Sequence, residues 1–145
     1  MQFAFAMGYR VVAIDSANKL DICSNLGAEF CIDSKANDLV DRVVAMTAGG
    51  CHGVVCLAGQ LEAFETSIAL ARKKGVIVCV ALPSGSFATP IFDITMKCLS
   101  IKGSLVGTRA DMQEAFDFVA RGKVHCHTKT ISFTGISTMN IIYCI

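Results

Sequence analysis

The sequence predicts an α/β domain in which a doubly wound parallel sheet carries helices on both faces. Short apolar runs alternate along the chain with segments of helical spacing. The apolar runs are nearly continuous, which is typical of strands buried on both faces. A length of 145 residues fits one domain. We therefore expect parallel strands joined by right-handed crossovers.

The first half of the chain predicts three strands and the helices that join them. Gly27 follows the first of the two predicted helices, and the pair Gly49 and Gly50 follows the second, where a helix stop is expected. The predicted elements are strand Tyr9–Asp15, helix Ala17–Leu26, strand Glu29–Asp33, helix Ala36–Thr47 and strand His52–Ala58.

The second half continues the alternation. A capping box is expected at the last complete helix, with Asp111 at the N-cap, Glu114 three residues on and Gly122 after the end. The predicted elements are helix Leu61–Lys73, strand Gly75–Leu82, turn Pro83–Gly85, helix Ile91–Lys97, strand Leu99–Val106, helix Asp111–Ala120, strand Thr128–Phe133 and a helix from Ile136.

Composition argues against several classes of protein. The net charge is +1 and the basic residues are scattered, so neither a nucleic-acid face nor a membrane anchor is expected. The apolar start at Met1–Met7 is too short for a signal sequence. The eight cysteines contain no C-x-x-C pair and several lie in apolar runs, which favours free thiols and a cytoplasmic location.

Asp15 is the most informative single residue, because it ends a predicted strand. In dinucleotide-binding folds an acid at the end of the second strand holds the adenine-ribose hydroxyls. Such a carboxylate would repel a 2′-phosphate, so NAD is favoured over NADP. The alternative is that Asp15 only starts the turn before the helix at 17–26.

The glycine-rich loop G-x-G-x-x-G is expected about 20 residues before such an acid. That position falls before residue 1, and the only nearby glycine is Gly8. The glycines at 49, 50 and 53 precede a strand instead of following one, so they indicate a helix stop and loop. We expect the chain to begin inside the first helix, with the first strand and the glycine-rich loop missing.

Several segments resemble the zinc-type, medium-chain alcohol dehydrogenases. These are AMGYRVVAID, NLGAEFCIDS, GCHGVVCLAG and KCLSIKGSLVGTRADMQEAFDFVARGKV, within a resemblance that runs from Gln2 to Thr138. It implies that 1–145 is a partial, Rossmann-like dinucleotide-binding domain, and that the separate N-terminal zinc domain is absent. The missing strand would lie between the strands at 9–15 and 52–58, and its loss would leave two unpaired edges and a marginally stable, aggregation-prone chain.

The resemblance also implies a set of NAD-binding residues. Asp15 matches the ribose-binding acid, Lys19 a supporting lysine, and Leu57 and Ala58 the adenine side. The remaining positions, on the nicotinamide side, are Val80, Leu82, Ser104 and Val106. Each of these apolar residues could equally be an ordinary core residue of a sheet, Ser104 could simply end a strand, and Arg109 is interpreted as structural.

Metal ligands are not expected in this chain, although family members bind a catalytic zinc through residues upstream of the glycine loop. His125, Cys126 and His127 are adjacent, but only the two histidines would share a face of a strand, and a zinc site needs three protein ligands. A surface loop is the simpler interpretation. Cys51 and His52 are interpreted as packing residues.

Three functions remain open from the sequence. The first is a fragment of an NAD-dependent alcohol dehydrogenase that is inactive alone and binds NAD weakly or not at all. The second is a non-catalytic module or pseudoenzyme that forms homo- or hetero-oligomers through the edge near Leu99–Val106. The third, a short-chain dehydrogenase, ranks last because neither Tyr9 nor Tyr143 has a lysine four residues on.

Overall fold

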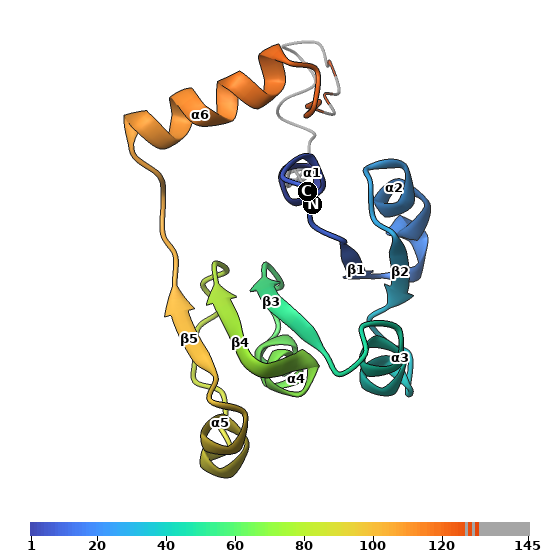
Figure 1. Cartoon of the computed structure of the whole chain (residues 1–145), viewed down its shortest axis with the longest axis vertical. Coiled ribbons are helices and arrows are strands. Elements are labelled where there is room, and N and C mark those ends of the chain that lie inside the picture. Colours follow the sequence, from blue (N-terminus) through green and yellow to red (C-terminus); the bar gives the residue numbers. More distant parts are fainter. Residues whose placement is uncertain (127, 129, 131–145) are drawn as a thin grey trace.

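A computed structural model describes residues 1–126, 128 and 130 (Figure 1). The elements are α1 (Gln2–Ala6), β1 (Val12–Asp15), the 3-10 helix η1 (Ala17–Lys19), α2 (Leu20–Asn25), β2 (Phe30–Asp33), α3 (Leu39–Met46), β3 (Cys51–Cys56), α4 (Leu61–Leu70), β4 (Ala71–Cys79), α5 (Ile91–Lys97), β5 (Ser100–Gly103) and α6 (Arg109–Ala120). Apart from Thr128 and Thr130, the strand predicted at 128–133 and the helix predicted from 136 lie outside the described residues.

The predicted α/β architecture is confirmed. β1 pairs with β2 in parallel, with Val12 opposite Phe30 and Asp15 opposite Asp33. β3, β4 and β5 form a second parallel sheet, in which β4 is central. Helices or helical turns connect successive strands, as the alternation of apolar and amphipathic segments predicts.

The strands divide into two sheets because β1 and β3 do not pair with each other (Figure 1). The expected interruption between these two strands is therefore present. One apolar cluster nevertheless spans the interruption: the buried side chains of Ile32, Val43 and Leu70 belong to it, and Val12, Ile14 and Val54 pack against it. The two sheets share a core although no backbone hydrogen bond joins them.

The junction between α4 and β4 differs from the prediction. The helix ends at Leu70 instead of Lys73, and β4 begins at the next residue, Ala71, which pairs with Cys51. Ala71 is only 1% exposed, and the register shifts before Val76 pairs with Gly53. Burial of Ala71 against β3 outweighs the helical preference of the basic residues that follow it.

Two glycines permit this junction. A Cβ on Gly50 would lie 2.8 Å from both the backbone N of Arg72 and the carbonyl oxygen of Leu70. A Cβ on Gly75 would lie 2.8 Å from the carbonyl oxygen of Arg72. Gly50 also has a φ of 108°, which glycine adopts without strain.

The start of α6 is also corrected. Its N-cap is Thr108 and not Asp111: the backbone N–H of Asp111 donates to Oγ1 of Thr108 at 3.2 Å, while the backbone N–H of Thr108 donates to Oδ2 of Asp111 at 2.6 Å. Thr108 and Asp111 thus form the capping box, and the N-cap lies three residues earlier than expected. Gly122 follows the helix, as predicted, and it has a positive φ of 66°.

The end of α6 and the residues after it contact the first residues of the chain. The rings of Phe3 and Phe118 meet edge to face at 5.7 Å between centroids. The side chain of Gln2 exchanges two hydrogen bonds with the backbone of His125, at 2.9 and 2.8 Å. None of the helices in the described part of the chain is long and apolar enough to cross a membrane.

Candidate functional site

Strand ends define the candidate site, because the carboxyl ends of parallel strands meet at the same edge of a sheet and form the ligand-binding edge of open α/β folds. Asp15 ends β1 and Asp33 ends β2, directly opposite each other in the parallel register. Leu57 and Ala58 follow β3, Val80 follows β4, and Ser104 follows β5. The predicted site residues therefore all lie at, or a few residues beyond, the carboxyl end of a strand.

The Asp15 carboxylate is held by its own neighbourhood. Its Oδ1 accepts hydrogen bonds from the backbone N–H of Ser16 at 2.7 Å and from the Ser16 hydroxyl at 3.2 Å. The ammonium nitrogen of Lys19 lies 3.8 Å from the same oxygen. Within residues 1–126 these contacts all fall on Oδ1, so Oδ2 remains open to accept a further hydrogen bond.

Lys19 reaches Asp15 although it lies in the short 3-10 helix after the strand. The two side chains are four residues apart and both are partly exposed. They form an ion pair at the ribose-binding position that the resemblance implies. Asp15 can therefore both start the turn and bind a ligand. Its Oδ1 makes the contacts within the turn, and its Oδ2 is left to accept a further hydrogen bond.

Asp33 is a second acid that sequence reasoning did not select. Its Oδ1 accepts the backbone N–H of Lys35 at 3.0 Å, so it caps the turn after β2. Like Asp15, Asp33 ends a short apolar strand, and this shared pattern could have identified it as a candidate site residue. It serves below as a matched control for Asp15.

The ends of β3 and β4 are joined by backbone hydrogen bonds. The carbonyl oxygen of Cys56 accepts from the N–H of Val80 at 3.1 Å and from the N–H of Ala81 at 3.3 Å. Ala58 and Val80 are half-buried, whereas Leu57 and Leu82 are 67% and 83% exposed. The alternative in which Leu82 is an ordinary core residue is wrong.

Beyond β5, the N–H of Ser104 donates to the carbonyl oxygen of Cys79 at 2.9 Å, which continues the sheet past Gly103. Val106 is 90% exposed, so it too is not a core residue. Apolar side chains at 57, 82 and 106 therefore project from the carboxyl ends of three neighbouring strands. Exposed apolar groups gathered at one edge are typical of a contact surface.

The described residues do not fit a zinc site. Among residues 1–126, 128 and 130, no three His, Cys, Asp or Glu side chains are placed to hold a metal ion. His52 is not a packing residue, because it is exposed and its Nε2 lies 2.8 Å from Nη1 of Arg72. His125 is anchored to Gln2 through its backbone, and Cys126 is exposed.

The cysteines in the described part of the chain are free thiols, as predicted. Burial raises the pKa of Cys23, Cys51 and Cys79 above the ordinary value for a thiol. A higher pKa leaves less thiolate at neutral pH, so these three are poor nucleophiles. No catalytic cysteine is indicated by their surroundings.

Comparison with known families decides the affiliation. Residues 1–121 match the family described as zinc-binding dehydrogenase. This chain belongs to the zinc-binding dehydrogenase family. The resemblance to the zinc-type, medium-chain alcohol dehydrogenases is thereby confirmed, and it agrees with the parallel strands and strand-end residues described above.

Curated relatives of this dehydrogenase chain are alcohol dehydrogenases from distant organisms. That of Rhizobium meliloti (strain 1021) is 38% identical over 144 residues, which are 99% of this chain and 41% of the relative. That of Geobacillus stearothermophilus is 40% identical over 138 residues, which are 94% of this chain and 40% of the relative. The chain thus spans about two fifths of the length of these relatives.

Solved structures agree on the fold. The alcohol dehydrogenase from Aeropyrum pernix superposes with a TM-score of 0.85 and 24% identity, over 94% of this chain and 40% of that one. A solved NAD-dependent alcohol dehydrogenase superposes with a TM-score of 0.79 and 27% identity, over 87% of this chain and 37% of that one. The two separate sheets of this dehydrogenase chain are therefore arranged as parts of one such domain.

Proposed function

We propose that this chain supplies the adenosine-binding side of an NAD-dependent alcohol dehydrogenase, with Asp15 accepting hydrogen bonds from the adenine ribose. The open Oδ2 of Asp15 at the carboxyl end of β1 is the observation that carries this proposal. When bound, NAD would accept a hydride from the alcohol. The affiliation with the zinc-binding dehydrogenases and the similarity to curated alcohol dehydrogenases support an oxidoreductase role for the protein that contains this chain.

The neighbouring residues suit this role. Leu57 and Ala58 would flank the adenine, and the strand ends at Val80, Leu82, Ser104 and Val106 would face the nicotinamide side. The negative charge of Asp15 favours a free ribose hydroxyl over a 2′-phosphate, so NAD is preferred to NADP. Lys19 would limit this negative charge and keep the site tolerant of the cofactor's own phosphates.

The 145-residue polypeptide tested by itself is expected to bind NAD weakly and not to oxidise alcohols. None of the described strand-to-helix connections carries G-x-G-x-x-G, the loop that supplies backbone N–H groups to a diphosphate. The described residues also do not fit zinc, so no step is assigned to a metal. Free thiols support a further proposal, that the protein works in the reducing cytoplasm.

The test is a titration of the isotope-labelled full chain with NAD, NADP and adenosine monophosphate, followed by NMR. We expect saturable shifts at Ser16 and Lys19 with millimolar NAD and smaller shifts with NADP. Asp15→Asn should weaken the response to NAD and reduce the preference over NADP, while the matched control Asp33→Asn should change neither. Equal responses of the two variants would overturn the proposed role of Asp15.

A second candidate, an association module, is favoured by one observation. β5 is an edge strand with all four residues exposed, and Leu105 beyond it is 72% exposed. An unpaired edge strand can pair with the same edge of another subunit. Sedimentation of the full chain tests this: Ile101→Lys should dissociate an oligomer formed through β5, and an unchanged mass would exclude that edge.

A further inference from the structure

Two cysteines lie side by side at the carboxyl ends of β3 and β4. Cys56 is the last residue of β3, Cys79 is the last residue of β4, and the two are partners in the parallel register. Cys56 is 5% exposed, Cys79 is half-buried, and both are free thiols. We call these two residues the strand-end thiol pair. Neither belongs to the NAD-binding residues proposed above.

The two thiols lie on the same face of the sheet. Side chains two residues apart on a strand share a face, so Cys56 lies on the same side of β3 as Val54. Val54 and Cys79 both pack against the apolar cluster that contains Ile77 of β4. Burial raises the pKa of Cys79, and the charge that Cys56 would carry as a thiolate raises that pKa further. The sulfur atoms are therefore close neighbours.

The spacing of the backbone suits a disulfide between the two residues. Neighbouring strands lie about 4.8 Å apart, within the range of about 4.4–6.8 Å that separates the Cα atoms of linked cysteines. Register partners in a parallel pair point their Cβ atoms the same way, whereas a disulfide brings these atoms to about 3.8 Å. The strands must therefore approach each other by about 1 Å. Each cysteine is the last residue of its strand, where the backbone shifts more readily than in the centre.

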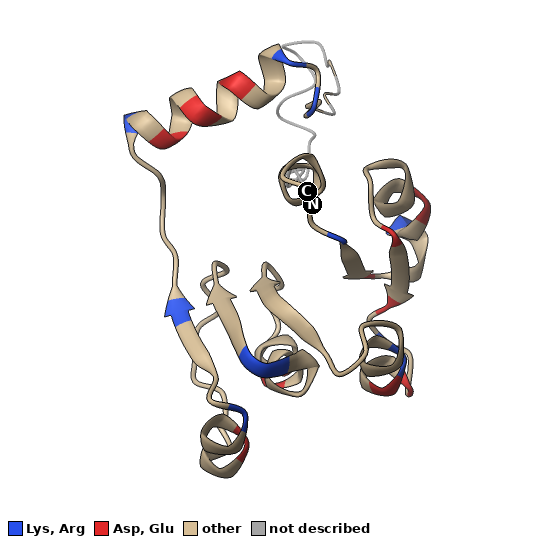
Figure 2. Ribbon diagram, viewed as in Figure 1, with Lys and Arg blue, Asp and Glu red and all other residues tan. Residues whose placement is uncertain are grey.

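The surroundings favour an uncharged link over a bound metal ion. Figure 2 shows β3 and the carboxyl-terminal half of β4 free of charged residues, and neither 51–56 nor 75–79 contains Lys, Arg, Asp or Glu. A metal ion binds thiolates, and burial opposes the thiolate of Cys79. A disulfide carries no charge, so no hydration of a charged group is lost when it is buried.

We propose that Cys56 and Cys79 form a reversible disulfide when the chain reacts with hydrogen peroxide. The peroxide oxidises the more exposed thiol, that of Cys79, to a sulfenic acid and is itself reduced, which releases one water. The sulfur of Cys56 then attacks the sulfur of Cys79, and the hydroxyl leaves with the thiol proton as a second water. Two thiols and one peroxide thus give one disulfide and two waters.

The same geometry makes the link reversible. The approach of the two Cβ atoms strains the disulfide, and strained disulfides are readily reduced by thiols. In a reducing compartment such a link is transient and serves in redox sensing. Its formation goes beyond the proposed function and does not depend on the binding of NAD.

Peptide mapping of the full chain tests the proposal. The chain is treated with hydrogen peroxide, the remaining thiols are alkylated, and trypsin is added without a reductant. Arg72 lies between the two cysteines, so trypsin places them in separate peptides that a disulfide joins. Mass spectrometry should find the joined peptides with two hydrogens fewer than the separate ones, and dithiothreitol should separate them. Sulfinic or sulfonic acid alone at Cys79 would overturn the proposal, as would unmodified Cys56 and Cys79 after exposed Cys98 has been oxidised.

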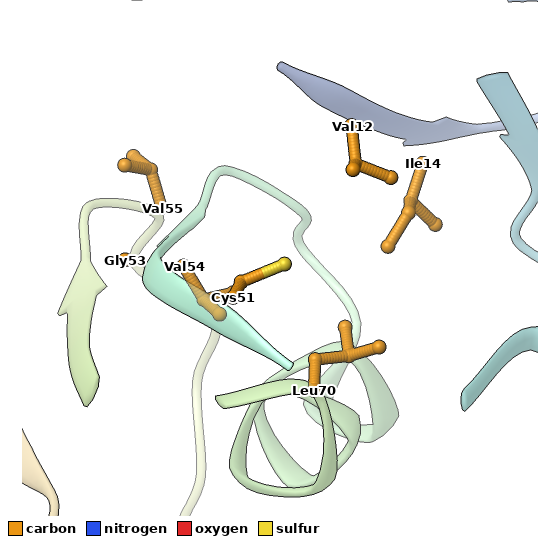
Figure 3. Close-up of a pocket in the computed structure, with 7 residues that line it drawn as sticks. All are labelled: Val12, Ile14, Cys51, Gly53, Val54, Val55 and Leu70. Atoms are coloured by element: carbon orange, nitrogen blue, oxygen red, sulfur yellow. The ribbon is translucent and has the colours of Figure 1, made fainter. Parts of the chain in front are cut away.

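Cys51 provides a matched control on the same two strands. It begins β3 and, like Cys79, has a pKa raised by burial, but its register partner on β4 is Ala71, which carries no thiol. Figure 3 shows its side chain beside Leu70, in the pocket between the two sheets and pointing toward β1.

We expect Cys51→Ser to leave the joined peptides unchanged and Cys56→Ser to abolish them. Cys51 and Cys56 share a tryptic peptide, so the two variants also show which of them is linked. If Cys56→Ser does not fold, fragmentation of the joined peptides from the unsubstituted chain assigns the linked residue directly. A link that persists in folded Cys56→Ser, or that fragmentation assigns to Cys51, would contradict the proposal.

Discussion

The ammonium nitrogen of Lys19 lies 3.8 Å from Oδ1 of Asp15, and both side chains are partly exposed. An exposed pair of this kind contributes about 0–1 kcal/mol to stability. We expect Lys19→Met to change the free energy of unfolding by less than about 1 kcal/mol. The same substitution should weaken NAD binding by about two- to fivefold, because the uncompensated Asp15 repels the cofactor's phosphates. Titration of both chains with NAD at low salt checks this, and tighter binding by the variant would contradict it.

Lys97 holds the junction between α4 and β4. Its ammonium group donates to the carbonyl oxygens of Ile68, Ala69 and Ala71 at 3.1, 3.2 and 3.2 Å. The carbonyls of Ile68 and Ala69 lie in the last turn of α4, where the helix has no internal donors left, and that of Ala71 belongs to the first residue of β4. Lys97→Met should lower the free energy of unfolding by about 1–3 kcal/mol. The exposed Lys102 on β5 provides the control, since Lys102→Met should have little effect in the same urea titration.

Cys98 adopts a left-handed backbone conformation at the end of α5, with a φ of 51°. This conformation costs a residue with a Cβ about 1–2 kcal/mol, and glycine avoids that cost. We expect Cys98→Gly to raise the midpoint of thermal unfolding and Cys98→Ala to leave it nearly unchanged. A lower midpoint for the glycine variant would show that the side chain, whose Sγ lies 3.6 Å from the carbonyl oxygen of Thr95, matters more than the backbone.

Arg10 and Glu29 form a bidentate ion pair, in which Nε and Nη2 of Arg10 each lie 2.7 Å from a carboxylate oxygen of Glu29. The hydrogen bonds from Arg10 lower the pKa of Glu29 below its ordinary value of 4.5. Because the pKa is lower in the folded chain, the stabilisation is complete above pH 4.5 and is lost as pH falls through the lowered value.

Arg10→Gln should therefore destabilise the chain above pH 4.5 and have progressively less effect below it. Urea midpoints of both chains across this range provide the measurement, and exposed Glu114→Gln is the control. A difference between the chains that grows as pH falls would have the wrong sign and would exclude this pair as the cause.

Thiol reactivity should follow burial. Cys98 and Cys126 are exposed, whereas Cys23 and Cys56 are buried, and burial raises the pKa of Cys23. In a timed reaction with iodoacetamide at neutral pH, mass spectrometry should find the two exposed cysteines modified first. Modification of Cys23 at the rate of Cys98 in the folded chain would mean that the packing around α2 opens readily.

Sequence reasoning succeeded where the signal is local. Helix α5 has the predicted bounds, and β1 and β2 end at the predicted aspartates, because apolar periodicity and turn residues act within a few positions. It failed at Ala71, whose strand conformation depends on pairing with Cys51, and at α6, where Thr108 and Asp111 are both suitable caps and only their reciprocal contact decides.

Candidate site residues divide in the same way. The position of Asp15 follows from its place at the end of an apolar run, but the reach of Lys19 back to it does not. Asp33 was missed although it carries the same strand-end signal, because no second feature accompanied it. The contacts of His52 with Arg72 and of Lys97 with α4 join segments 20 or more residues apart and leave no local trace.

The order of apolar and amphipathic segments was enough to predict the α/β class and the parallel strands, and the resemblance of several sequence segments to the zinc-type, medium-chain alcohol dehydrogenases indicated the family. Tertiary structure alone decided that the two sheets share one apolar core and that, within residues 1–126, the contacts of the Asp15 carboxylate all fall on one of its two oxygens. The reason is physical: periodicity records which side of an element is buried, whereas pairing and hydrogen bonding depend on distant residues that the fold brings together.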